Sequence, residues 1–407
     1  MRVERNWAGN HVYGARVLHR PAGVEEVREL AAGRERIRVL GTRHSFTAIA
    51  DSEELMLLDA LPAEVRVDHA RGVVSLAGGV SYGALAAELA REGVALANLA
   101  SLPHISVAGA VATATHGSGD GNGNLATSVA ALELVTSAGE LVTVRRGEQD
   151  FDGHVVALGA LGAVVRLELD VEPAYEVSQH VFEGLAWDAL GDDVFARAYS
   201  VSAFTRWGAQ VDQVWLKRRA GDPPAELPGA RAASEARHPI LGNDPQHATP
   251  QLGEAGPWSQ RLSHFRLEFT PSNGAEIQSE YHVARPRAAA AIEALRAAAP
   301  AFRDLVLVTE LRTVAADDLW LSPQYGQDTL GIHFTWAREP EAVDRALEVV
   351  EAALAPFEPR PHWGKLFHIG RDELAARYLR LRDFAALAAR LDPRGAFRNA
   401  WLEERLL

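Results

Sequence analysis

One segment of the chain, residues 100–123, consists almost entirely of small side chains. It reads ASLPHISVAGAVATATHGSGDGNG and has glycines at 109, 117, 119, 121 and 123. Small residues let a backbone approach a ligand closely, and consecutive N–H groups can bind a pyrophosphate. A mobile surface loop seldom mixes glycine with so many small apolar residues, so the segment favours a buried phosphate site.

Two common nucleotide-binding motifs are missing from this segment. Neither G-x-G-x-x-G nor G-x-x-x-x-G-K-[ST] occurs there, and the third glycine position after Gly117 and Gly119 holds Asn122. The site is therefore neither a Rossmann site nor a Walker site, and an NAD-dependent dehydrogenase is disfavoured.

A second loop, GTRHSF at residues 41–46, follows a short apolar run that reads as a strand. It presents His44 at a glycine-containing turn. A histidine in such a place is more often a hydrogen-bonding loop residue than a reactive one, and these residues alone leave both interpretations open.

Length and composition limit the class of protein. A chain of 407 residues suggests two domains, and 47% hydrophobic and 23% charged residues are typical of a globular protein. The net charge of -13 argues against nucleic-acid binding, and the basic run 217–219 is interpreted as a solvated strand end. No cysteine is present for disulfides or thiolate metal sites. Without a signal-peptide pattern or an apolar run of membrane-spanning length, we expect a cytoplasmic protein with no membrane partner.

The residue pattern divides the chain near residue 174. Before it, we expect strands at 65–68, 73–76, 131–136, 141–144 and 164–171, and a helix at 83–92. After it, we expect strands at 265–269, 280–283, 304–308 and 331–335 and helices at 288–299 and 341–354. A Pro/Gly/Ala-rich excursion at 221–257 is either a functional loop or a solvated insertion.

Several separated motifs together resemble a known family. GTRHSF, THGSG at 115–119 and GALGAVV at 159–165 resemble the FAD-binding domain of the vanillyl-alcohol-oxidase type. The resemblance is closer to the alditol (xylitol) oxidases and covers nearly the whole chain, through NWAGN, ASLPHISVAG, YSVSAFTRW, QVWLKRR, HFRLEFTPS, ELRTVAAD, HFTW, RPHWGK and LDPRGAFRNA. It implies an α+β fold of two domains: an FAD-binding domain at 1–174, a substrate (cap) domain at 175–375 with a mainly antiparallel sheet and flanking helices, and a C-terminal segment at 376–407 that returns to the first domain.

The same resemblance implies FAD, covalently bound through His44. The residues that it places at the cofactor are Gly41, Thr42, Arg43, His44, Ser45, Phe46, Thr47, Ser101, Ser106, Gly109, Thr113, Thr115, His116, Gly117, Ser118, Val165, Thr335 and His362.

The candidate substrate residues lie mostly in the second domain. Glu310 and Arg312 are two apart, so on a strand they share one face, although a surface ion pair is the alternative interpretation. Resemblance adds Ser101, Thr335 and Lys365. We expect Lys365 to act as base, because burial can lower the pKa of a lysine, and Arg312 to stabilise the alkoxide. Glu310 completes the catalytic set.

No metal site is expected, because H-E-x-x-H is missing and the histidines at 104, 116, 154 and 333 lack ligand spacing. The expected reaction oxidises the C1 hydroxyl of an alditol to the aldose and reduces oxygen to hydrogen peroxide, with polyol and oxygen as partners. An aldonolactone-type dehydrogenase of the same fold and a flavin-binding module without catalysis are the alternatives. The sequence indicates no oligomeric state.

Overall fold

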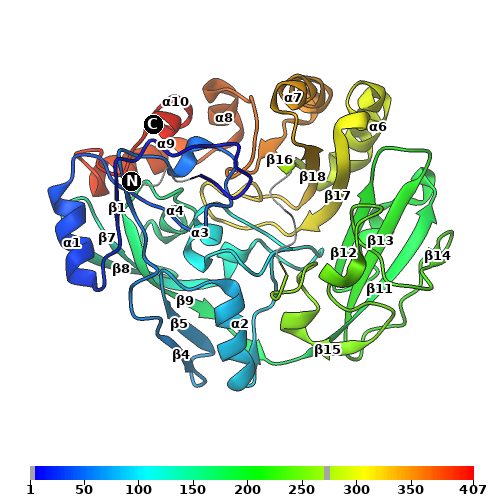
Figure 1. The fold of residues 1–407 in the computed structure, drawn as a ribbon, viewed down its shortest axis with the longest axis horizontal. Coiled ribbons are helices and arrows are strands. Elements are labelled where there is room, and N and C mark those ends of the chain that lie inside the picture. Colours follow the sequence, from blue (N-terminus) through cyan, green and yellow to red (C-terminus); the bar gives the residue numbers. More distant parts are fainter. Residues whose placement is uncertain (1–4, 270–275) are drawn as a thin grey trace.

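The structure is a computed structural model that describes residues 5–269 and 276–407. Most of its strands belong to two antiparallel sheets, and the parts of the molecule built on them lie side by side (Figure 1). Residues 5–173 form the first part, here called the first unit.

The first unit is built on a five-stranded antiparallel sheet. Its central strand β9 alternates buried and half-buried residues, as expected where one face packs on a core. The strands in sheet order are β4 (Val65–Asp68), β5 (Val73–Ala77), β9 (Ala163–Asp170), β7 (Val129–Val135) and β8 (Leu141–Arg145). A small parallel sheet contains β1 (Val17–His19), β3 (Glu54–Met56) and β2 (Arg38–Val39), and β6 (Val94–Ala95) pairs with β10 (Glu172–Pro173). The five strands of the larger sheet confirm the five expected positions to within a few residues.

Four helices accompany these strands: α1 (Val24–Gly33), α2 (Tyr82–Arg91), α3 (Val107–Ala112) and α4 (Phe151–Val155). Ser81 caps α2 by accepting the Ala84 N–H, and Gly93 follows the helix with a φ of +69°, which suits glycine. The helix expected at 83–92 is thereby confirmed. The short helix α3 lies inside the small-residue segment.

The second sheet has nine strands, and its neighbouring strands run antiparallel. In order they are β14 (Arg231–Ala232), β11 (Glu176–Leu185), β13 (Val211–Arg219), β12 (Ser200–Thr205), β17 (Val306–Val314), β18 (Thr329–Ala337), β16 (Glu276–Ala284) and β19 (Arg360–Pro361), with β15 (Ala255–Pro257) paired to β11. The expected helices at 288–299 and 341–354 are confirmed as α6 (Ala288–Ala298) and α7 (Pro340–Leu354), which lie next to each other beside β16, β17 and β18 (Figure 1). The short α5 (Asp192–Phe195) precedes β12.

The excursion at 221–257 is anchored to the second sheet at a few buried residues, although most of its residues are exposed. Gln179 of β11 donates to the Thr249 carbonyl at 3.2 Å, and Gln213 of β13 donates to the His238 carbonyl at 2.9 Å. His238 is buried. The side-chain amides of these two glutamines therefore hold the excursion against the sheet.

The C-terminal helices α8 (Arg371–Arg377), α9 (Leu381–Leu391) and α10 (Ala400–Arg405) lie on the first unit (Figure 1). The Ile37 N–H donates to the Ala396 carbonyl at 2.8 Å, and Asn399 donates to carbonyls next to the His44 loop. The end of the chain therefore contacts the first unit, and the domain division implied by the resemblance stays a prediction.

Two expectations from the sequence are wrong. Residues 265–269 form no strand: Phe265 makes one isolated bridge to Ala248 and turns follow, because its backbone N–H donates to the Ser101 carbonyl. Lys217 is not solvated but 1% exposed in the middle of the sheet. Within the described ranges, no helix combines the length and apolar character needed to cross a membrane.

Candidate active site

A cavity of about 760 Å³ is lined by residues of both parts of the molecule. The first unit contributes the His44 loop and the α3 region, and the second sheet contributes β16, β17 and β18. Most of the residues expected at the cofactor line it: Gly41, Thr42, Arg43, His44, Ser45, Phe46, Ser101, Ser106, Gly109, Thr113, Thr115, His116, Thr335 and His362.

Four of the expected cofactor residues do not line the cavity. Thr47 caps the turn after the His44 loop, and Ser118 bonds to the Ser200 hydroxyl at 2.6 Å. A Cβ on Gly117 would meet the Leu99 carbonyl at 2.5 Å, and Val165 is buried in a core cluster. These four residues lie behind the cavity wall and support it. Their direct contact with the cofactor stays a prediction.

The backbone before His44 turns sharply. Arg43 has a φ of +66°, and the turned chain stacks the His44 ring on Trp7 with centroids 5.6 Å apart. His44 Nδ1 lies 3.1 Å from the Thr42 hydroxyl, which also accepts the Ser106 N–H. Burial, and to a smaller extent His104, lowers the pKa of His44 to about 4. The imidazole is therefore neutral near pH 7 and keeps the lone pair that a nucleophile needs.

The cavity wall near Ser106 has no room for larger residues. A Cβ on Gly41 would lie 2.8 Å from the Ser106 hydroxyl, and one on Gly109 would lie 2.7 Å from it. On the same wall, a Cβ on Gly79 would meet the Leu58 carbonyl at 2.2 Å. Backbone is thus exposed to the cavity where an elongated phosphate-containing cofactor needs close approach, so this wall fits a nucleotide such as FAD.

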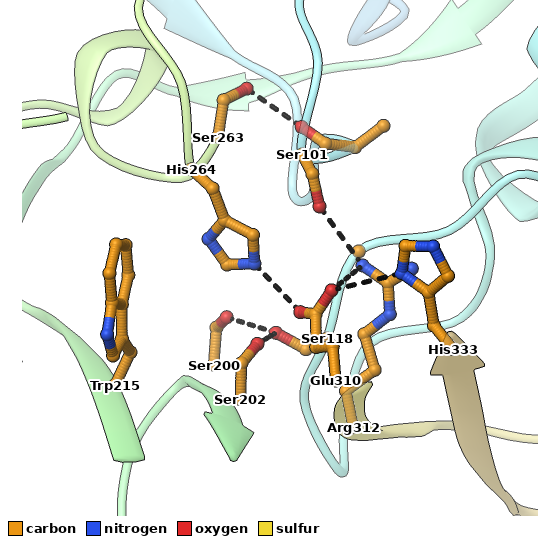
Figure 2. Close-up of polar contacts among 12 residues, drawn as sticks. Ser101, Ser118, Ser200, Ser202, Trp215, Ser263, His264, Glu310, Arg312 and His333 are labelled. Carbon is orange, nitrogen blue, oxygen red and sulfur yellow. Dashed lines mark hydrogen bonds and ion pairs between the residues drawn. The ribbon is translucent and has the colours of Figure 1, made fainter. Parts of the chain in front are cut away.

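The other end of the cavity is strongly polar. Glu310 and Arg312 lie on the same face of β17, and both are about 95% buried, which contradicts a surface ion pair. Arg312 donates to the Ser101 hydroxyl at 3.2 Å and lies 3.4 Å from Glu310 Oε2 (Figure 2). The structure therefore brings Ser101 together with the predicted pair, across more than 200 residues of sequence.

Lys365 and Thr335 complete the predicted substrate set at the cavity wall. The side chain of Lys365 donates to Glu280 Oε2 at 2.6 Å. Burial lowers the pKa of Lys365, and Glu280 partly opposes this change. Glu280 thus favours the protonated, positively charged form of Lys365, the residue that we expect to act as the base.

Glu280 is the main functional candidate that sequence reasoning missed. It is 1% exposed and lines the cavity. Besides the bond from Lys365, it accepts a hydrogen bond from Arg312 at 3.3 Å, and its Oε1 lies 2.9 Å from Nε2 of His116. Burial opposes its charged form, but Lys365, His116 and Arg312 outweigh burial and hold its pKa well below the usual value. No sequence motif singles it out, because its partners come from other elements.

His333 lines the cavity beside Glu310, although no sequence motif indicates a role for it there (Figure 2). Its Nδ1 lies 3.6 Å from Glu310 Oε2, and neither ring nitrogen has a hydrogen-bond partner among the described residues. Burial lowers its pKa to about 4. A neutral imidazole therefore faces the cavity with hydrogen-bonding capacity to spare.

Three potential metal ligands, His116, Glu280 and His282, have ligand atoms within 4.8 Å of one another. Sequence spacing did not indicate this group. However, Glu280 already binds the cations of Lys365 and Arg312, and these would repel a divalent ion. The group is better explained as an ion-pair network of the cavity wall.

Comparisons with known proteins agree with this geometry. The family described as "FAD binding domain" matches residues 16–145, and the family described as "D-arabinono-1,4-lactone oxidase" matches residues 273–405. The fold is that of cholesterol oxidase from B. sterolicum, with a TM-score of 0.82 over 100% of this chain and 96% of that one at 15% identity. This likeness, together with the match to the FAD-binding family, confirms the predicted fold of the vanillyl-alcohol-oxidase type.

Two relatives match almost the whole chain. An L-gulono-1,4-lactone dehydrogenase of Mycobacterium tuberculosis is 29% identical over 97% of this chain and 96% of its own. An alditol oxidase of Streptomyces sp. is 48% identical over 98% of both chains. The chain therefore belongs to the alditol oxidases, FAD-dependent oxidoreductases of the vanillyl-alcohol-oxidase family.

Proposed function

We propose that the protein oxidises the terminal C1 hydroxyl of alditols such as xylitol and sorbitol to the aldose, and that oxygen is reduced to hydrogen peroxide. The alcohol would lose a hydride and a proton, and oxygen would take up two electrons and two protons to become hydrogen peroxide. Bound FAD supplies the hydride acceptor.

The observation that carries the proposal is the convergence of donors and acceptors on the wall of one cavity. Ser101 and Thr335 offer hydroxyls, Glu310 offers a carboxylate, and Arg312 and Lys365 offer cationic donors. A chain of neighbouring hydroxyl groups can use all of these at once. An alcohol without them would leave buried polar groups unpaired, which supports a polyol substrate.

Covalent attachment of FAD through His44 is part of the proposal. It is supported by the neutral ring of His44 and by its fixed position between Trp7 and Thr42. Wall residues with little bulk, such as Gly41 and Gly109, would lie along the nucleotide.

Arg312 and Lys365 would stabilise the negative charge on the C1 oxygen as its proton leaves. Lys365 stays the predicted proton acceptor, but its contact with Glu280 favours the cation. His333 is a second candidate, because it is neutral and its ring nitrogens lack partners among the described residues. The pH dependence of the reaction separates these two bases.

The proposal is tested by an absorbance spectrum of the purified protein without oxygen, before and after xylitol is added. We expect xylitol to bleach the flavin and air to restore it with one peroxide per oxidised polyol. A flavin that polyols cannot bleach contradicts the proposal and favours a binding module.

An aldonolactone dehydrogenase is the second candidate function, because the M. tuberculosis relative carries that name. It predicts bleaching by L-gulono-1,4-lactone rather than xylitol and little peroxide under air. The same two measurements therefore decide between the candidates.

A further inference from the structure

Lys217 is a buried lysine that the proposed reaction does not use. It lies on β13 and forms no salt bridge with any carboxylate in the described part of the chain. Its ammonium group donates to the carbonyls of Leu262 and Ser263 and contacts Nδ1 of His264 at 3.1 Å. Three donor hydrogens thus meet three acceptors, and this satisfies the group.

His264 contacts Lys217 through one ring nitrogen and Glu310 through the other. Figure 2 shows its ring directed toward Glu310. Its Nε2 is 2.8 Å from Oε1 of Glu310. Trp215 and Phe204 contact the ring edge-on, with centroids 5.4 Å and 5.5 Å away. The aromatic contacts therefore restrict the orientation of the imidazole.

The two polar neighbours of His264 select one protonation state. The Lys217 cation needs a lone pair on Nδ1, whereas the Glu310 carboxylate needs a proton on Nε2. Only the neutral Nε2–H tautomer satisfies both. Turning the ring over would place carbon atoms against both charged groups.

This arrangement leaves one carboxylate oxygen of Glu310 for a ligand. Oε1 accepts from His264, while Oε2 lies 3.4 Å from Arg312 and 3.6 Å from His333. Both contacts are longer than a short hydrogen bond, so Oε2 can still accept a hydrogen bond from a substrate hydroxyl. Glu310 can accept that bond only while it stays an anion or presents a bare oxygen.

We propose that Lys217 and His264 are positioning residues: Lys217 fixes the Nε2–H tautomer of His264, which holds Glu310 as an acceptor for a substrate hydroxyl. The inference deepens the proposed function and rests on it for the identity of the substrate. Neither residue needs to touch the polyol.

A pH dependence follows from the charges that face His264, which are Lys217 from β13 and Glu310 and Arg312 from β17. Burial, Lys217 and Arg312 lower the pKa of His264 to about 4, and Glu310 opposes them. Burial also lowers the pKa of Lys217 itself to about 7, with Glu310 opposing and Arg312 adding to this change, so Lys217 is a cation below about pH 7. Removing the lysine cation raises the pKa of His264, so an imidazolium forms at higher pH. An imidazolium pairs with Glu310 and weakens it as an acceptor, so activity falls as the pH falls through the raised pKa.

The tautomer can be measured without substrate, by NMR of the FAD-loaded enzyme labelled with ¹⁵N at histidine. His264→Gln assigns the signals. We expect a bare Nδ1 and a protonated Nε2 over roughly pH 5–7 in the parent, where Lys217 is charged, and growing imidazolium at the acid end of this range in Lys217→Met. A protonated Nδ1 in the parent, or an unchanged titration in Lys217→Met, overturns the inference.

Kinetics with xylitol across the same pH range provide the second test. We expect Lys217→Met to lower kcat/KM by about tenfold at the acid end of the pH range. The acid limb of the profile, where kcat/KM falls as the pH falls, should move to higher pH. His264→Gln keeps a donor toward Glu310 and an acceptor toward Lys217, does not titrate, and should stay within about threefold of the parent. In the double variant, the acid limb should return to the parent's position.

Arg218→Met is the matched control, because it removes a neighbouring cation from the opposite face of β13. It should leave the acid limb in place. A loss in Lys217→Met that is equal at all pH values, or a shifted limb that persists in the double variant, shows a packing role and contradicts the inference. If the parent does not oxidise xylitol, the proposed function fails, while the NMR experiment still decides the tautomer.

Discussion

At the scale of single residues, burial sets the protonation of the groups that face the cavity. His44, His264 and His333 all have pKa values lowered to about 4, with burial as the main cause. The cavity thus combines neutral imidazoles with the paired charges of Glu310 and Arg312. These three histidines are all neutral, but they can serve different roles because their neighbours differ.

His44 carries the first prediction. Replacing it by alanine removes the nucleophilic nitrogen from the loop, so FAD should become extractable by acid or denaturant, whereas the parent keeps flavin fluorescence on the denatured chain. His104→Ala is the control, because His104 also lines the cavity but bonds to the Leu267 carbonyl. That variant should keep its flavin. A parent that releases all flavin on denaturation contradicts covalent attachment.

The identity of the base is the second prediction, measured by stopped-flow reduction with xylitol. If Lys365 is the base, the rate rises with pH as the lysine loses its proton, and Lys365→Met lowers the rate by roughly 10²–10⁴-fold and removes the rise. If His333 is the base, the rate is already level above a pKa of about 4, and His333→Gln has the larger effect. A Lys365→Met enzyme with the parent's rate and pH profile removes Lys365 from the chemistry.

Sequence could predict those site residues whose geometry is local. The face shared by Glu310 and Arg312 follows from strand alternation. Glu280 meets Lys365 across 85 residues, and Lys217 meets His264 across 47, so only the fold brings these partners together. A lysine in a basic run reads as solvated, and nothing near Lys217 in sequence reveals the carbonyls that surround it.

At the scale of elements, periodicity predicted the long helices and most strands. It failed at residues 265–269, where FRLEF alternates like a strand although its backbone bonds to the loop at Ser101. It also gave no helix at α3, since a run of valine, alanine and glycine carries no polar face. Both misses lie beside the cavity, where contacts between distant segments override local preference.

The loop that contains Ala100 and Ser101 carries the third prediction. Ala100 lines the cavity, and its carbonyl accepts the Ser263 hydroxyl at 2.8 Å, so its backbone is fixed and a larger side chain must project into space that is now open. We expect Ala100→Leu to slow reoxidation by oxygen more than reduction by xylitol, because a larger side chain here would narrow the space through which we propose that oxygen reaches the flavin. Ala100→Gly, which keeps the space, should change neither half-reaction much. Equal slowing of both half-reactions in Ala100→Leu would contradict a role of this position in the access of oxygen.

At the scale of the whole molecule, the C-terminal segment contacts the residues that follow the His44 loop. Asn399 donates to the carbonyls of Ala48 at 2.9 Å, Ile49 at 3.3 Å and Asp51 at 2.8 Å, and its Oδ1 accepts the Leu402 N–H at 3.0 Å. One side chain thus caps α10 and holds the turn that follows the predicted flavin attachment site. The chain's last segment is therefore part of the support of the cofactor loop.

The last prediction separates these two roles of Asn399. Asn399→Ala loses the cap, about 1 kcal/mol, and the bonds to the carbonyls, about 1–2 kcal/mol, so the melting temperature should fall by several degrees. Asp caps helices as well as Asn does, but Asn399→Asp turns an oxygen toward three carbonyl oxygens. If holding the loop matters, Asp is therefore less stable than Ala, and its flavin is more easily lost before attachment. Glu404→Ala, on the exposed side of α10, is the control and should melt like the parent. Thermal melts of the four proteins, with covalent flavin content measured alongside, decide the order: an aspartate variant as stable as the parent reduces Asn399 to a helix cap and leaves the loop held by other contacts.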